Sequence, residues 1–227
     1  MLIFLLFIGF FVVRYVLVLR QYKRSSYYVV TRNSFFYVRS DKGRFGEYCT
    51  YLKLRDLEEQ GGKFLFNVYI PTQNCTTEID LLMICRRGIF VFESKNYSGW
   101  IFGKESQQKW TQTLPHGRGS HKEHFYNPVL QNKGHLQALQ NYIGAEVPLW
   151  SIIVFSERCT LKNVQVTSPN ISVVNRYDLL PEVTMRLNRA PAVFSEEDVE
   201  RVYAFLYPCS QVSAAVKAQH IENITSH

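Results

Sequence analysis

The sequence lacks the features that define several classes of protein. Its five cysteines form no CxxC pair and no zinc-ligand spacing, and their odd number does not suit a disulfide framework. We therefore expect reduced thiols and a cytosolic environment for the domain that carries them. The chain also has no internal repeat and no low-complexity segment, and 46% hydrophobic with 20% charged residues is typical of a globular protein.

Acidic residues are nearly absent from the first 46 positions. This segment contains eight Lys and Arg but a single acid, Asp41, which gives it a net charge of +7. The rest of the chain contains eighteen basic and eighteen acidic residues and is therefore neutral. The overall charge of +7 thus describes the N-terminal segment and is no evidence that the globular part binds nucleic acid.

Residues 1–19 contain only one charged residue, Arg14, in an apolar run. About 20 residues cross a bilayer core as a helix, so residues 1–20 are predicted to form a transmembrane anchor. A cleaved signal peptide would have a basic start and a small-x-small site, and neither is present. Arg20, Lys23 and Arg24 follow the run and predict that this flank stays in the cytoplasm. We expect a single-pass protein of the cell membrane with a cytoplasmic domain; the alternative is a helix buried in that domain.

The remaining sequence predicts alternating helices and strands. Helices are expected at residues 43–60, 129–143 and 195–218, and strands at 63–70, 77–85, 88–95, 100–102, 109–113, 150–155 and 171–174, with a polar loop at 114–124. This order predicts a mixed β-sheet flanked by helices, of the α/β or α+β class. We assign residues 21–40 to a basic connector, 41–155 to the core, and 156–227 to a strand and helix extension packed on it.

One expected strand ends in residues that suit a metal site. Alternation along residues 88–95 places Glu93 and Lys95 on the same side. A tight turn before this strand would bring Asp80, on the preceding strand, alongside them. Two carboxylates with the main-chain carbonyl of Ser94 are ligands that Mg²⁺ or Mn²⁺ prefers. Lys95 would then orient or deprotonate a water beside a phosphate, with a pKa lowered by the metal and by burial.

The residues around this set resemble a known family. The pattern consists of Gly46-Glu47, Glu78-Ile79-Asp80, Phe92-Glu93-Ser94-Lys95-Asn96-Tyr97-Ser98-Gly99, Trp110 and Asn127-Pro128 followed by Gln131. Over about residues 41–155 it resembles the nuclease-related (NERD) domain, which belongs to the PD-(D/E)xK restriction-endonuclease-like superfamily. The resemblance implies a restriction-endonuclease-like fold and metal-dependent hydrolysis of nucleic acid.

The resemblance also implies roles for individual positions. Glu47 matches the acid of the first helix, Asp80 and Glu93 match the metal-binding carboxylates, Lys95 matches the catalytic lysine, and Gln131 matches a supporting polar residue. Many members place a polar residue directly after the aspartate, whereas this chain has Leu81. Because Leu81 faces the other side of its strand, this departure concerns substrate contacts rather than metal binding.

Simpler interpretations exist for each of these residues. Glu93 and Lys95 could form a surface ion pair, Glu47 could be a solvated first-turn acid, and Gln131 could brace its neighbours. Zinc binding by His116, His121 and His124 is disfavoured, since they lie in a Gly-containing loop without a cysteine partner. Trp100 and Trp110 are interpreted as hairpin core, and His135 as a helix-face residue.

Three functional hypotheses follow. The first is a membrane-anchored nuclease that uses Mg²⁺ or Mn²⁺, with DNA rather than RNA as the expected partner. The second is a nucleic-acid-binding or protein-interaction module that keeps the fold without turnover, and the third is a scaffold whose basic flank binds anionic lipid. Residues 86–133 carry eight basic and three acidic residues, which suits either a phosphate-binding surface or a solvated loop.

Overall fold

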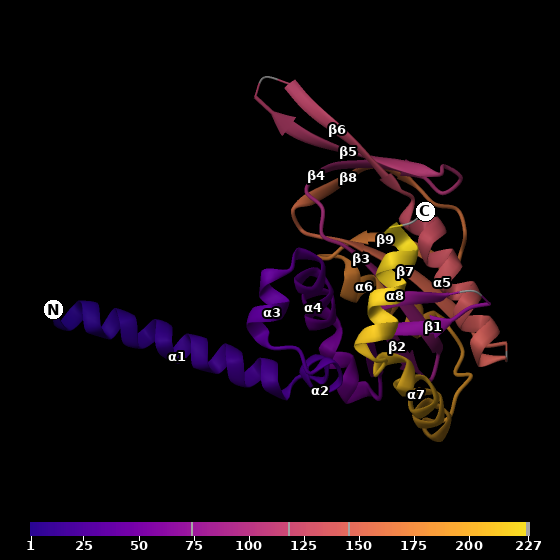
Figure 1. Cartoon of the computed structure of the whole chain (residues 1–227), viewed down its shortest axis with the longest axis horizontal. Coiled ribbons are helices and arrows are strands. Elements are labelled where there is room, and N and C mark those ends of the chain that lie inside the picture. The colour runs from indigo at the N-terminus through magenta and orange to yellow at the C-terminus, as the bar shows by residue number, and fades with distance from the viewer. Residues whose placement is uncertain (74, 118, 145, 226–227) are drawn as a thin grey trace.

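Two mixed β-sheets and the helices around them make up the computed structural model, which describes residues 1–73, 75–117, 119–144 and 146–225 (Figure 1). The side chains of residues 2, 3, 5, 116, 224 and 225 lie outside this description. This arrangement confirms the expected α/β class. The single mixed sheet of the prediction is, however, divided into two.

The first sheet has the strand order β1-β2-β3-β7-β9. Its strands are β1 (Lys63–Pro71), β2 (Thr76–Cys85), β3 (Gly88–Lys95), β7 (Leu149–Phe155) and β9 (Ile171–Asn175). The first three are antiparallel, and β7 and β9 continue the sheet in parallel with β3. The strands expected at residues 63–70, 77–85, 88–95, 150–155 and 171–174 are thereby confirmed. Most positions of β2, β3 and β7 are buried, which is why apolar runs predicted these strands.

Helices cover both faces of this sheet. The helix α4 (Lys42–Leu54) lies on the face that carries Ser94, and a 3₁₀ helix, η1 (Arg55–Gln60), continues it. On the opposite face, α5 (Pro128–Ile143) contacts Lys95. The expected helix 43–60 is therefore correct in extent but changes its geometry after Leu54.

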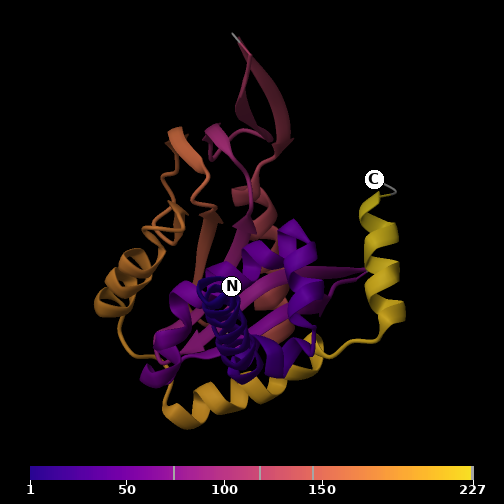
Figure 2. The same cartoon turned by 90° about the vertical axis from the view of Figure 1, so that its left-hand side faces the viewer.

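The second sheet has the order β6-β5-β4-β8 and lies beyond the end of the first (Figure 2). Its strands are β4 (Gly99–Lys104), β5 (Lys109–His116), β6 (Gly119–Tyr126) and β8 (Cys159–Gln165). The predicted loop at 114–124 is wrong, because β5 and β6 form a long hairpin there. Nearly all of β6 is exposed, so it has no alternation of apolar and polar residues that could reveal a strand.

The C-terminal extension contains more elements than predicted. Besides β9, it forms β8, α6 (Leu179–Arg189), α7 (Glu196–Ser210) and α8 (Ala214–Thr225). The capping box that Ser195 and Asp198 predicted is present at the start of α7. The expected helix 195–218 is instead divided in two: α7 ends at Ser210, two residues after Pro208, and α8 begins at Ala214.

At the N-terminus, α1 (Leu2–Arg24) projects from the body, as Figures 1 and 2 show from two directions. Among the described residues, no helix is long and apolar enough to span a membrane. The predicted transmembrane helix at residues 1–20 is therefore not confirmed. Part of that prediction, the side chains of residues 2, 3 and 5, lies outside the described residues.

The segment expected to be a connector is folded. It forms α2 (Ser26–Thr31) and α3 (Phe35–Ser40), whose buried residues join the main core. Tyr22 and Tyr27 are 1% and 0% exposed and pack edge-to-face against Tyr48. Because these aromatic contacts are long-range, no local period in residues 21–40 could predict them.

Candidate active site

The acids and the lysine of the predicted site meet where the end of β3 lies between the middle of β2 and α5. The Nζ of Lys95 lies 2.7 Å from Oε1 of Glu93 and donates a 2.9 Å hydrogen bond to Oε1 of Gln131. The Glu93 side chain is 3% exposed and that of Lys95 18%, so the pair is not the surface ion pair of the simpler interpretation. Residues of β3 and α5 thus hold one ammonium group in place.

Asp80 joins this group through the register of the β2–β3 hairpin. Leu81 pairs with Phe92, so the next step of the register sets Asp80 opposite Glu93. Its Oδ2 accepts a 2.9 Å hydrogen bond from the main-chain N–H of Ser94. In an extended strand the C=O of a residue points to the same side as its N–H, so the Ser94 carbonyl faces the same edge.

The proximity of these charges shifts their protonation equilibria. Burial, together with the carboxylates of Glu93 and Glu47, raises the pKa of Asp80 well above its usual value. Burial would also raise the pKa of Glu93, but Lys95 and His135 outweigh it and lower that pKa. For Lys95, burial lowers the pKa, whereas Glu93 and Asp80 outweigh it and raise the pKa. The expected lowered lysine pKa is therefore wrong for the protein alone, in which Lys95 is held as an ammonium.

Glu47 reaches the site from α4. Its Oε2 accepts a 3.2 Å hydrogen bond from Nδ2 of Asn67, and burial, reinforced by the nearby Glu78, raises the pKa of Glu47 to about 7. It is therefore not the solvated first-turn acid of the simpler interpretation.

Asn67 is a residue that the sequence analysis missed. It lies in β1 opposite Asp80, between the pairs Phe66–Leu81 and Val68–Ile79, and has a left-handed φ of 48°. Asn adopts this conformation more readily than other residues with a Cβ, and such strain is common at functional sites. An asparagine inside an apolar strand was the only signal available.

His135 was also missed, because it was interpreted as a helix-face residue. It is 6% exposed, its Nδ1 lies 2.7 Å from Oγ1 of Thr77, and its Nε2 lies 3.2 Å from Oε2 of Glu93. The latter contact lacks hydrogen-bond geometry, and neither atom has a hydrogen-bond partner among the described residues. The available signal was spacing, since His135 is four residues after Gln131 and thus on the same side of α5.

The start of α5 explains the Asn-Pro motif. The side chain of Asn127 accepts a hydrogen bond from the N–H of Val129, and Pro128 takes the first helical position. The Asn127 amide also donates to three carbonyls of the turn between β4 and β5. This double attachment determines where the helix begins and therefore where Gln131, one turn later, meets Lys95.

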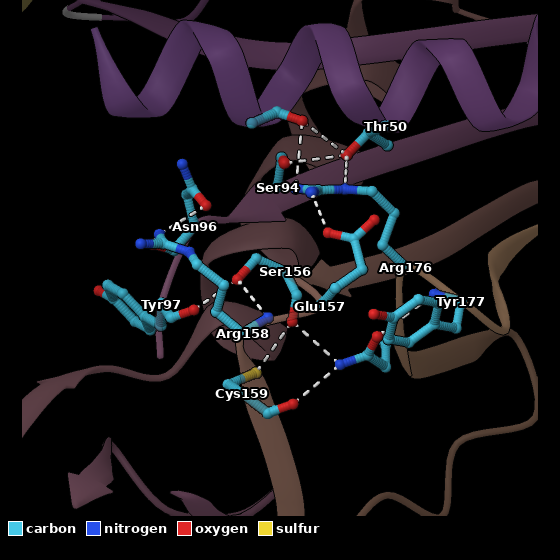
Figure 3. A network of polar contacts seen from close by, with 12 residues as sticks. Thr50, Ser94, Asn96, Tyr97, Ser156, Glu157, Arg158, Cys159, Arg176 and Tyr177 are labelled. Atoms are coloured by element: carbon cyan, nitrogen blue, oxygen red, sulfur yellow. Dashed lines mark hydrogen bonds and ion pairs between the residues drawn. The ribbon is translucent and has the colours of Figure 1, made fainter. Parts of the chain in front are cut away.

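The opposite side of the site rests on a buried arginine (Figure 3). Arg176 is 4% exposed, forms a 2.6 Å ion pair with Glu157, and donates to the carbonyl of Gly46 at 3.3 Å and to Oγ1 of Thr50 at 3.4 Å. The Thr50 hydroxyl in turn lies 3.0 Å from Oγ of Ser94. The C-terminal extension thus supports the strand that carries Glu93 and Lys95.

The donor set fits a divalent cation. Among the described residues, no three His, Cys, Asp or Glu side chains form a group that could hold a metal by themselves. Mg²⁺ needs only one or two carboxylates, because waters and substrate phosphates complete its shell. Asp80 and the buried, unpartnered Oε2 of Glu93 supply two carboxylates, and the Ser94 carbonyl supplies a third oxygen.

The histidines considered for zinc lie on the β5–β6 hairpin. His121 and His124 point to opposite faces of β6; His121 contacts Glu123 and His124 contacts Thr111. The side chain of His116 lies outside the described residues.

The two tryptophans differ in burial. Trp110 is fully buried and stacks on Phe155, with 6.2 Å between ring centroids and 7° between ring planes. Trp100 is 46% exposed. The interpretation as hairpin core is therefore confirmed for Trp110 and wrong for Trp100.

Comparison with known proteins agrees with this geometry. The family model described as "Nuclease-related domain" (NERD) matches residues 42–156. A protein of Bacillus anthracis that is described as uncharacterized is 30% identical over 182 residues, which are 80% of this chain and 82% of that protein. No solved structure matches the chain.

Proposed function

Because the chain belongs to the nuclease-related domain (NERD) family, we propose that it hydrolyses phosphodiester bonds of nucleic acid with Mg²⁺ or Mn²⁺. The observation that carries the proposal is the placement of Lys95, which is held between Glu93 and Gln131 beside Asp80. The succession of α4, three antiparallel strands, α5 and a strand parallel to β3 supports a restriction-endonuclease-like core.

Each residue has a specific role in this proposal. The ammonium of Lys95 has three protons. Two of them point to Glu93 and Gln131, and the third is left to bind a water or a phosphoryl oxygen. The positive charge then offsets the negative charge that develops on the phosphate. Glu47, held by Asn67, adds negative charge near Asp80 from α4, and His135 on α5 positions Glu93. A divalent cation bound by Asp80, Glu93 and the Ser94 carbonyl would supply charge that polarises the phosphate and makes a water more acidic.

The test is cleavage of labelled DNA and RNA, single-stranded and duplex, by the full chain with Mg²⁺, Mn²⁺ or EDTA. We expect metal-dependent cleavage that falls about 100-fold or more in Lys95→Ala and in Asp80→Ala, because each change removes a charge from the reacting centre. Lys53→Ala, at an exposed lysine of α4, is the matched control and should retain activity. Cleavage that persists in both site variants would disprove the assignment.

A second candidate is a nucleic-acid-binding module without turnover. One observation favours it: Lys95 already satisfies Oε1 of Glu93, so the pair also works as a structural ion pair. In that case the cleavage assay shows no product under any metal condition, while the same labelled nucleic acids still bind to the protein.

We also propose that α1 attaches the protein to the cell membrane with the globular domain in the cytoplasm. From Phe4 to Val18 its described apolar side chains are exposed on all sides; Phe4, Leu6, Phe7, Phe10 and Val13 are each more than half exposed. Such a surface is unfavourable in water and suits a lipid environment. Arg20, Lys23 and Arg24, at its C-terminal end, suit anionic headgroups.

A further inference from the structure

The second sheet has an inner and an outer face that differ in chemistry. Ile101 and Trp110 point inward and are fully buried in a small cluster with Phe155. Gly103 faces inward as well, where a Cβ would lie 2.2 Å from the ring of Trp110. The glycine therefore lets the tryptophan fill the inner face, and the residues that alternate with this set must point outward.

Strand register identifies the outward residues. Between β4 and β5, Trp100 pairs with Thr113 and Phe102 with Thr111. Between β5 and β6, Thr113 pairs with Lys122, Thr111 with His124 and Lys109 with Tyr126. Lys104 continues the same alternation along β4. Thr113 is buried at 6% exposure. We call the other members of this set, together with Lys162, the outer face: Trp100, Phe102, Lys104, Lys109, Thr111, Lys122, His124, Tyr126 and Lys162.

The outer face is positively charged. It carries four exposed lysines (Lys104, Lys109, Lys122 and Lys162), and none of them forms an ion pair with a described residue. Glu123 is the one carboxylate within the described parts of the four strands, and alternation places it on the inner side, where it contacts His121. A surface that carries lysines and no carboxylate of its own is complementary to a phosphate backbone.

Aromatic rings accompany the lysines. Trp100 is 46% and Tyr126 is 52% exposed, and Phe102 is partly exposed between them. A shift in the β4–β8 register after Ile101 leaves Lys162 unpaired and places its ammonium 5.3 Å from the centroid of the Trp100 ring. β-Bulges commonly re-aim a side chain in this way. Lysine and aromatic side chains therefore share one surface.

From this combination we infer that the outer face binds single-stranded nucleic acid. Bases of a single strand expose their flat faces and stack on aromatic side chains, while lysines contact the backbone. A duplex keeps its bases stacked on one another and offers no such faces. The inference deepens the proposed nuclease function, on which it rests, by naming the strandedness of the substrate.

The connection between the outer face and the candidate active site is short. Only four residues lie between Lys95 and Trp100, so their Cα atoms are about 17 Å apart at most. A strand on the outer face thus lies within a few nucleotides of the carboxylates. The β5–β6 hairpin extends this surface away from the body (Figure 1).

The test is fluorescence anisotropy with the full chain in non-ionic detergent and EDTA, using a labelled 16-nucleotide DNA, the RNA of the same sequence, and the DNA duplex. We expect the single strands to bind more tightly than the duplex. Trp100→Ala and Tyr126→Ala should each weaken single-strand binding by about 5- to 100-fold. Trp100→Phe keeps a ring and should retain most of the affinity, and the DNA and RNA arms identify the preferred backbone.

The matched aromatic control is Tyr177→Ala, since Tyr177 is 67% exposed and likewise has a lysine, Lys53, 6.0 Å from its ring. For charge, Lys109→Gln with Lys122→Gln should reduce the slope of log affinity against log salt by about 1.4, whereas Lys53→Gln with Lys217→Gln should leave it unchanged. The inference would be overturned if single strands did not bind or if the duplex bound equally well. It would also be overturned if Trp100→Ala, Tyr126→Ala and Tyr177→Ala all had the same affinity for the single strand. Because EDTA prevents metal-dependent turnover, a lack of cleavage in the separate nuclease assay refutes catalysis and leaves this result standing.

Discussion

At the residue scale, Glu47 is a carboxyl group whose surroundings favour its neutral form. Burial and the neighbouring Glu78 raise its pKa from 4.5 to about 7, so the folded protein binds this proton more tightly than the unfolded chain. The stability that this preference contributes is present below about pH 4.5 and is lost as the pH rises through 7. A divalent cation at Asp80 and Glu93 would favour the ionised form instead.

We predict that Glu47→Gln changes this pH dependence. In EDTA, the wild type should lose stability between pH 5 and pH 8 as Glu47 ionises, whereas the variant has no charge to bury. The free energy of unfolding of the variant minus that of the wild type should therefore be about 1–3 kcal/mol larger at pH 8 than at pH 5. Urea denaturation at both pH values measures the difference. Glu59→Gln, at an exposed glutamate of η1, serves as the control. An equal difference for Glu47→Gln at both pH values would contradict the burial argument.

His135 shows how a residue gains a role through its partner rather than its own element. On α5 alone it is one polar residue among several. In the fold it lies between Thr77 and Glu93 and contributes to the lowered pKa of Glu93. Its position on the same side of the helix as Gln131 identifies it as a positioning residue for the carboxylate.

At the scale of the element, the start of α5 links stability to the site. Asn127 caps the helix and donates to three carbonyls, so its removal costs both the cap and the contacts that attach the helix start to the turn after β4. The same loss frees the helical turn that carries Gln131.

Asn127→Ala should therefore lower the free energy of unfolding by about 2–4 kcal/mol. Ser195→Ala removes the exposed cap of α7 and should cost only about 1 kcal/mol. Chemical denaturation of both variants makes the comparison. Similar losses in the two would show that the carbonyl contacts of Asn127 contribute nothing beyond the cap.

The strands β6 and β8 illustrate why some elements escape sequence analysis. Both are exposed along most of their length, and their backbone hydrogen bonds come from β5 and β4, respectively. A strand of this kind depends on its neighbour and leaves no hydrophobic period in its own residues.

At the scale of the whole molecule, the apolar α1 and the globular domain face different surroundings. We predict that the full chain floats with vesicles of mixed neutral and anionic lipid. Replacing Phe7, Phe10 and Phe11 with serine should abolish flotation, since each phenylalanine contributes about 1.5–3 kcal/mol when buried. Phe205→Ser, at a half-exposed phenylalanine of α7, is the control. Unchanged flotation of the triple variant would exclude α1 as the attachment.

The sequence by itself determined the central strands, the start of α5 and the acids and lysine of the site, because these depend on local alternation, capping and short hairpins. Asp80, Glu93 and Lys95 are brought together by a two-residue turn, and the register follows from it. Only the tertiary structure revealed the packing of residues 21–40, the second sheet, and the contacts of Asn67, His135 and Arg176. These depend on partners distant in sequence: Arg176 meets Gly46 and Thr50 across more than 120 positions, a pairing that neither segment encodes alone.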